Sequence, residues 1–191
     1  MKPVVVSGVG RCGTSMIMAM LEAGGMKVNG SAPLYGGVME MADSVPAGKR
    51  GIFLGDHTAS KLLLPYLDAL DPKSAYRFIW MVRDPIQQAM SQAKFAARTK
   101  GIDSDATALK QMADHNMKYA KIGLRRCQVG FGEGSTCYAR RFEWCLENPG
   151  ELADDLIEYL GLGKEMFHPM AAVVRKRPVE CAEGMEFEVK P

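Results

Sequence analysis

One glycine-rich segment of this chain has the composition of an anion-binding loop, and it reads GVGRCGTS over residues 8–15. Its glycines allow a tight turn that aims successive backbone N–H groups at a bound anion. A helix that starts directly after the turn adds unpaired N–H donors and the positive end of its dipole. The candidate ligand-binding residues are therefore Gly10, Arg11, Cys12, Gly13, Thr14 and Ser15.

The loop is close to the pattern GxxxxGK[ST], but Thr14 stands where that pattern has lysine. An ATP or GTP phosphotransferase uses this lysine on the β- and γ-phosphates. Here the cation comes earlier, at Arg11, which favours anion binding with a different donor. A glycine-rich turn without a ligand remains the plainer alternative.

Cys12 has two interpretations. A helix N-terminus stabilises a thiolate, so Cys12 could be a reactive nucleophile. A phosphatase loop would need an arginine six positions later, where this chain has Met18. The sequence therefore favours Cys12 as a small residue that fits within the turn.

A second group of polar residues follows the strand-like run RFIWMV at 77–82. Arg83, Asp84 and Pro85 come directly after it, and Ser91 lies about two turns into the helix that Pro85 would start. A guanidinium, a hydroxyl and a helix N-terminus could converge there on a second phosphate. The alternative is a salt-bridged helix start with no ligand.

Taken together, these segments resemble the PAPS-dependent sulfotransferase family, in which PAPS is 3′-phosphoadenosine 5′-phosphosulfate. GVGRCGTS resembles the family's GxxRSGTS-like loop, and VRDPIQQAMS resembles its VRDP signature with a serine eight residues after the arginine. The turn GDHT at 55–58 is similar to the family's GDKT, and RFEWCLENPGELADDLIEYLGL is similar to its RYEDLLENP…FLGL segment. The resemblance covers roughly residues 3–162. Cys12 replaces the usual serine, His57 replaces the usual lysine, and the chain is short for the family.

The resemblance implies an enzyme that transfers a sulfuryl group from PAPS to a hydroxyl or amine acceptor by in-line displacement and releases PAP. The 5′-phosphosulfate would lie in the loop at 8–15, and Arg83 and Ser91 would bind the 3′-phosphate. Arg11 would neutralise charge that develops on the leaving phosphate. A metal ion is not expected, and the acceptor would be a small molecule or a glycan.

Family members use a histidine or a glutamate as the base that takes the acceptor's proton. Glu40, in the segment after the first helix, and His57 are the candidates here, with Asp56 as a third. A late basic segment binds the 3′-phosphate in the family, and 175–177 (Arg-Lys-Arg) is its counterpart unless it is a solvated tail. Two other functions remain open: a divergent P-loop nucleotide kinase that uses ATP, and a catalytically degenerate protein that binds a nucleotide or a protein partner.

Strand-like and helical segments alternate along the chain. Strands are expected at 4–7, 51–54, 77–82 and 136–142, and helices at 14–23, 59–70, 85–97, 106–127 and 149–160. Residues 26–50 and 98–106 have the composition of loops, and the chain from Lys164 onward is expected to be irregular. This order predicts an α/β protein with three α/β/α layers around a central parallel sheet, like that of P-loop NTPases, in one domain over 1–191.

The composition agrees with a small charged ligand. The net charge of +2 predicts no nucleic-acid partner, and no apolar run reaches the ~20 residues of a membrane span. Five scattered cysteines form no CxxC pair, which favours reduced thiols and a cytoplasmic location. The sequence gives no indication of oligomeric state.

Overall fold

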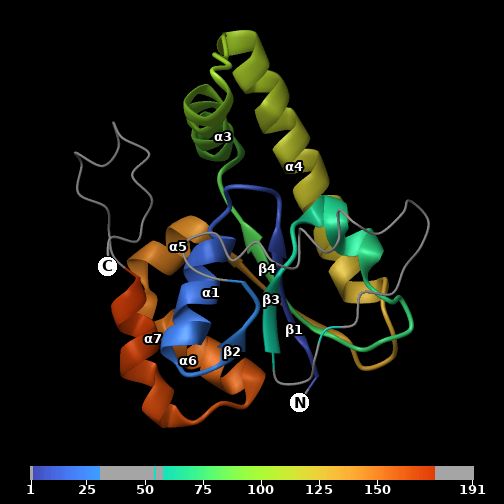
Figure 1. The fold of residues 1–191 in the computed structure, drawn as a ribbon, viewed down its shortest axis with the longest axis vertical. Helices are drawn as coiled ribbons and strands as arrows, with labels where there is room; N and C mark the ends of the chain where they lie inside the picture. Colours follow the sequence, from blue (N-terminus) through green and yellow to red (C-terminus); the bar gives the residue numbers. More distant parts are fainter. Residues whose placement is uncertain (1, 31–53, 55–57, 175–191) are drawn as a thin grey trace.

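The computed structural model describes residues 2–30, 54 and 58–174 of the 191-residue chain (Figure 1). The strands are β1 (Val4–Gly8), β2 (Lys27–Val28), β3 (Thr58–Lys61), β4 (Arg77–Val82) and β5 (Thr136–Arg141). The α-helices are α1 (Thr14–Ala23), α3 (Pro85–Lys100), α4 (Ala106–Val129), α5 (Phe142–Glu147), α6 (Pro149–Leu160) and α7 (Phe167–Val173). Two 3₁₀-helices complete the described elements: η1 (Leu64–Ala69) and η2 (Lys164–Met166).

The five strands form one parallel sheet in the order β2-β3-β1-β4-β5. β1 lies at its centre, where Val4 pairs with Ala59 on one side and with Arg77 on the other. The carboxyl ends of parallel strands meet at one edge of the sheet, where ligands of such folds bind. The loop after β1 and Arg83 after β4 therefore share that edge.

Helices cover both faces of the sheet (Figure 1). Because side chains alternate along a strand, Val4 and Val6 face a core formed with α1, α6 and α7, whereas Val5 faces a core formed with η1 and the end of α4. All three valines are fully buried, which explains why this strand is a continuous β-branched run. The predicted α/β/α architecture is confirmed. The α3/α4 hairpin extends beyond the layers (Figure 1).

Several predicted elements match the structure. The helices at 14–23 and 149–160 and the strand at 77–82 have the predicted bounds. Gly161 ends α6 with φ 67°, in the left-handed conformation that glycine adopts without strain. Gly101 ends α3 in the same way, so this helix runs three residues past the predicted end at 97.

Four predictions were wrong. The apolar spacing at 59–70 predicted one helix, but Thr58–Lys61 pairs with β1 as strand β3 and only Leu64–Ala69 is helical. The loop at 26–50 contains the two-residue strand β2, and Phe142 begins helix α5 instead of ending a strand. The segment from Lys164 is helical through α7, whose Met170 is buried in the core beside α1.

Other predictions fall mostly outside the described residues. Of the strand expected at 51–54 only Leu54 is described, and it is not in a strand. The remainder of the expected loop at 31–50 and the chain from 175 onward are also outside. Among the helices that are described, none has the length and apolar character to cross a membrane.

Candidate active site

The loop between β1 and α1 has the backbone conformation of a glycine turn. Gly13 is the N-cap of α1 with φ 98°, and its carbonyl accepts the first bonds of the helix from Met16 and Ile17. A side chain at 13 would also collide with the ring of Phe142, so both backbone and space require glycine. Arg11 has φ 70°, the only such value among the described non-glycine residues.

Cys12 lies inside the turn and is 1% exposed. A β-carbon on Gly8 would overlap its Sγ, so strand end and thiol pack directly against each other. Burial raises the pKa of this thiol to about 12, which leaves it protonated at neutral pH. The structure therefore agrees with Cys12 as a small loop residue and gives it none of the thiolate character of a nucleophile.

Arg11 extends from the loop toward α3. Its Nε donates to Ser91 Oγ at 3.4 Å, and its guanidinium lies 5.4 Å from the centroid of the Phe95 ring. Burial lowers the pKa of this arginine. Arg11 thus connects the loop to the serine that was predicted to bind the second phosphate.

Arg83 completes this second group. Its Nη1 donates to the carbonyl of Arg11 at 3.1 Å, and its guanidinium lies 4.7 Å from the centroid of the Phe142 ring. Its Nε is buried and has no hydrogen-bond partner among the described residues. Burial lowers the pKa of Arg83, and nearby Arg11 lowers it further, whereas Glu143 raises it. A buried guanidinium nitrogen with an unused donor fits an anionic ligand such as a 3′-phosphate.

The neighbouring acidic residue, Asp84, has a structural role. Its carboxylate accepts from the backbone N–H groups of Ile86 and Gln87 and so caps α3. Its own N–H donates to Glu143 Oε1 at 2.9 Å, which ties the start of α3 to α5. Asp84 therefore serves as the N-cap of α3, while Arg83 faces the loop.

Lys61, the last residue of β3, belongs to this site although no sequence motif indicated it. It is 5% exposed, and its Nζ donates to Ser15 Oγ at 3.3 Å. Burial, followed by repulsion from Arg11, lowers the pKa of Lys61 to about 8. A neighbouring strand thus supplies an amino group to the loop that has threonine in place of lysine at position 14. The helix predicted over 59–70 did not indicate a site role for Lys61, because only a parallel strand beside β1 would bring residue 61 to this edge of the sheet.

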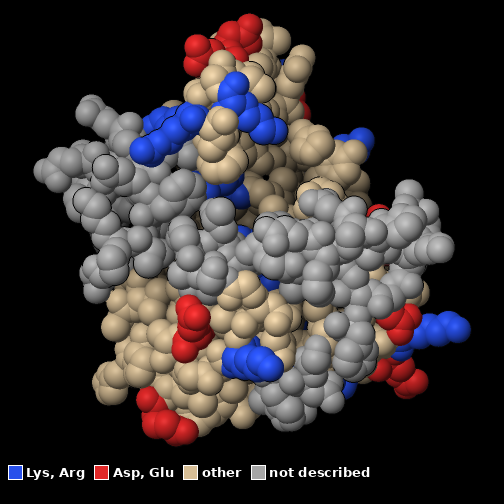
Figure 2. All heavy atoms as spheres, in the orientation of Figure 1, with Lys and Arg blue, Asp and Glu red and all other residues tan. Residues whose placement is uncertain are grey.

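The structure brings together all the predicted donor-binding residues: Gly10, Arg11, Cys12, Gly13, Thr14, Ser15, Arg83 and Ser91. The candidate bases Glu40, Asp56 and His57 and the basic segment 175–177 lie outside the described residues. In the described part of the chain, no group of three acidic, histidine or cysteine side chains is arranged to hold a metal ion. Figure 2 shows lysine and arginine side chains around the α3/α4 hairpin on the viewed face, and acidic ones at its tip.

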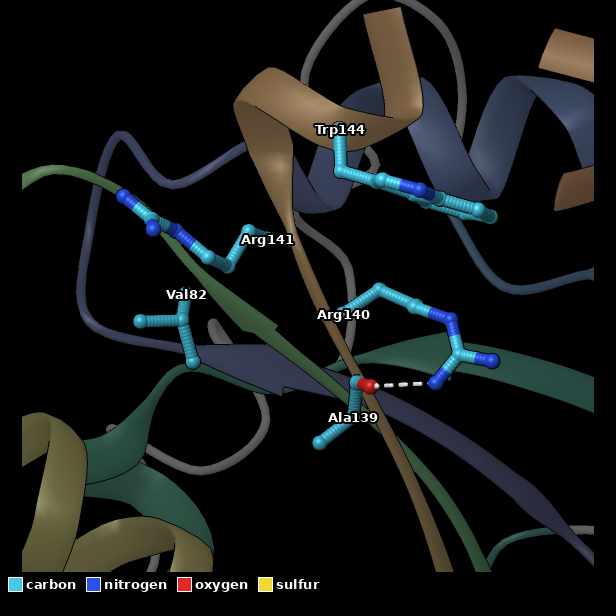
Figure 3. A pocket seen from close by; sticks show the side chains of 5 residues that line it. All are labelled: Val82, Ala139, Arg140, Arg141 and Trp144. Atoms are coloured by element: carbon cyan, nitrogen blue, oxygen red, sulfur yellow. Dashed lines mark hydrogen bonds between the residues drawn. The ribbon is translucent and has the colours of Figure 1, made fainter. Parts of the chain in front are cut away.

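A cavity of about 450 Å³ lies at the carboxyl ends of β4 and β5 (Figure 3). It is lined by Val82, Ala139, Arg140, Arg141 and Trp144, for which the sequence suggested no role. Arg140 contacts the rings of Tyr138 and Trp144 and forms an ion pair with Asp155 at 2.7 Å. The charge of Arg140 is therefore already compensated, and the cavity presents largely apolar surface at the ends of β4 and β5.

The fold is that of known sulfotransferases. The chain aligns with the mouse sulfotransferase SULT7A1 complexed with PAP (TM-score 0.53, 12% identity), over 91% of this chain and 64% of that one. It also aligns with retinol dehydratase in complex with androsterone and the inactive cofactor PAP (0.52, 15%; 91% and 64%). A third match is the sulfotransferase domain from the curacin biosynthetic pathway (0.51, 13%; 87% and 76%). This chain thus spans about two thirds of the length of two of these proteins. No protein-family model matches the sequence, and no curated protein matches it significantly.

Proposed function

We propose that this protein is a PAPS-dependent sulfotransferase that acts on a hydroxyl or amine acceptor. The observation that carries the proposal is the presence of two cationic sites at one sheet edge, Lys61 with Ser15 and Arg83 with Ser91, joined by Arg11. A ligand with two separate anionic groups, such as a 3′,5′-bisphosphorylated nucleoside, matches this arrangement. Two of the structures that share the fold contain PAP.

Different residues of the site would bind different parts of PAPS. The N–H groups of the loop and of the first turn of α1 would hold the 5′-phosphosulfate, with Ser15 and Lys61 beside it. Arg83 and Ser91 would hold the 3′-phosphate. When bound, PAPS supplies an activated sulfuryl group whose S–O bond to the phosphate breaks as the acceptor attacks in line.

Two cationic side chains could stabilise the negative charge that grows on the leaving phosphate. Arg11 was assigned this role from the sequence, yet its side chain lies against Ser91. Lys61 lies against Ser15 in the loop itself. We therefore assign charge stabilisation in the transition state to both, with the Lys61 amino group beside Ser15 and the Arg11 side chain between the two sites.

The acceptor's proton must pass to a base within hydrogen-bond reach. Glu40, His57 and Asp56 remain the proposed bases, and a small molecule or a glycan remains the proposed acceptor. The largely apolar cavity at the ends of β4 and β5 offers room for an uncharged part of a ligand.

The second candidate function is a nucleotide kinase. Lys61 supports it, because an amino group beside Ser15 could bind the β- and γ-phosphates of ATP. Thermal-shift measurements with PAP, AMP and ATP, each with magnesium and with EDTA, separate the two functions. A sulfotransferase site should bind PAP best and retain it in EDTA. Stronger, magnesium-dependent stabilisation by ATP would overturn the proposal, and tight PAP binding without sulfuryl transfer would indicate a non-catalytic relative.

A further inference from the structure

Three consecutive backbone carbonyls of the loop accept hydrogen bonds from the side chains of Arg83 and of helix α3. The carbonyl of Arg11 accepts from Arg83. The carbonyls of Val9 and Gly10 each accept from Gln88 Nε2 at 2.8 Å, and Gly10 also accepts from Gln92 Nε2 at 3.0 Å. We infer that Gln88, Gln92 and Asn116 form an amide clamp that positions the loop for anion binding.

Two of the three side chains of the clamp are almost completely buried. Gln88 is 2% exposed and Asn116 is 1% exposed, although amide side chains are mostly found at protein surfaces. The two N–H groups of Gln88 each have a loop carbonyl as acceptor. The carbonyl of Gly10 accepts from two glutamines, which uses both of its lone pairs.

Asn116 reaches the loop only through Gln92. Gln92 Nε2 donates to Asn116 Oδ1 at 3.1 Å, and Asn116 Nδ2 donates back to Gln92 Oε1 at 2.9 Å. This reciprocal pair fixes the orientation of the Gln92 amide, so that its second N–H faces Gly10. Asn116 therefore connects α4 to the loop, and it is a positioning residue that touches no ligand.

The physical need for such a clamp comes from the anion. A carbonyl oxygen that turned toward a phosphate would repel it, whereas an N–H would attract it. The carbonyls of Val9 and Gly10 are held against α3 and that of Arg11 against Arg83, which leaves these peptide groups little freedom to reverse. This arrangement also supports the left-handed conformation of Arg11, which is unfavourable for a residue with a side chain. A loop fixed before binding loses less entropy when the ligand binds.

The inference rests on the anion-binding role proposed for the loop, and it concerns the 5′-phosphate, which AMP and PAP share. Gln88→Met keeps the length of the side chain and removes both donors. Gln92→Met removes one of the two donors to Gly10. Gln87→Met is the matched control, because Gln87 is the adjacent residue of α3 and is exposed. Affinity for AMP and PAP is measured by titration calorimetry well below the melting temperature of each variant.

We expect Gln88→Met to lower the affinity for both ligands by roughly 10-fold or more, and Gln92→Met to lower it by roughly 3-fold, since one or two hydrogen bonds that position the loop are lost. Gln87→Met should stay within about 2-fold of wild type. Equal losses for AMP and PAP distinguish the clamp from Arg83, whose removal should weaken PAP binding far more than AMP binding, because it also removes the contact proposed for the 3′-phosphate. A purely structural role would lower the melting temperature and leave both dissociation constants unchanged, which would overturn the inference.

Other outcomes are equally decisive. If Gln88→Met does not fold, Gln92→Met decides alone, and an affinity equal to that of wild type rejects the clamp. If the wild type binds ATP but not PAP, the sulfotransferase proposal fails, and the same variants test the clamp with ATP. If the wild type binds none of the three nucleotides, both proposals fail.

Discussion

The lowered pKa of Lys61 makes ligand affinity depend on pH in a defined direction. The amino group titrates near pH 8 in the unliganded protein, because it is buried and close to Arg11. An anion bound at Ser15 would favour the charged form and raise this pKa. Ligand binding above pH 8 should therefore take up a proton, and affinity should fall as the pH rises through 8.

The size of the effect follows from that pKa. With a pKa of about 8, Lys61 is roughly nine-tenths charged at pH 7 and roughly one-tenth charged at pH 9. If the charged form alone binds tightly, the dissociation constant for PAP should rise about 10-fold between pH 7 and pH 9. Proton uptake should approach one per PAP at pH 9 and be near zero at pH 7. The Cys12 thiol titrates near pH 12 and contributes little in this interval.

The assay is titration calorimetry with PAP at pH 7, 8 and 9, in two buffers of different ionisation enthalpy at each pH. Lys61→Met should bind PAP more weakly at pH 7, show no proton uptake, and have an affinity that is flat with pH. Lys110→Met, which removes a side chain that is 83% exposed on α4, should behave as wild type. A wild-type affinity that is constant from pH 7 to 9, or an unchanged pH dependence in Lys61→Met, would refute the placement of Lys61 beside the ligand.

Substitutions at three further positions test the site. Arg83→Ala should weaken the binding of PAP by roughly 1.5–3 kcal/mol in calorimetry and leave the binding of AMP, which lacks the 3′-phosphate, almost unchanged. Equal losses of binding for the two nucleotides would contradict the assignment of Arg83 to the 3′-phosphate. Arg11→Ala should lower kcat for sulfuryl transfer by roughly 100-fold with a smaller rise in donor KM, and Arg11→Lys should recover part of the rate. Retained kcat with weaker donor binding would make Arg11 a binding residue only. Gly13→Ala should cost about 1–3 kcal/mol of unfolding free energy in urea, because a β-carbon strains the backbone at φ 98° and collides with Phe142; an unchanged midpoint would show that the loop accommodates it.

The parts of the site that the sequence predicted depend on local signals. A run of valines ends at Gly8, and a helix follows Gly13 directly. Pro85 fixes the first turn of α3 and Asp84 supplies its cap, so the position of Arg83 before a helix could be predicted from neighbouring residues alone. These segments needed only the assumption of a parallel sheet to bring them to one edge.

The parts that the sequence did not predict depend on distant pairing. Thr58–Lys61 contains little β-branched or apolar sequence, yet all four residues are buried because β3 pairs with β1 and β2. The apolar residues that follow suggested a helix through the same segment, and with it Lys61 was assigned to the wrong element. The amide clamp was missed for the same reason, since nothing near Gln88 or Asn116 in the sequence indicates that loop carbonyls lie beside them.

The charge arrangement of the site is itself an argument for an anionic ligand. Burial lowers the pKa of Arg11, Lys61 and Arg83, and repulsion from Arg11 lowers that of the other two further. Folding therefore brings three cationic groups together at a cost in free energy, although nearby surface positions would leave each one solvated. A bound phosphate or phosphosulfate would offset that cost by restoring opposite charge at short range, and the fixed loop N–H groups would add to it. The cost therefore falls in the region where an anionic ligand would offset it most.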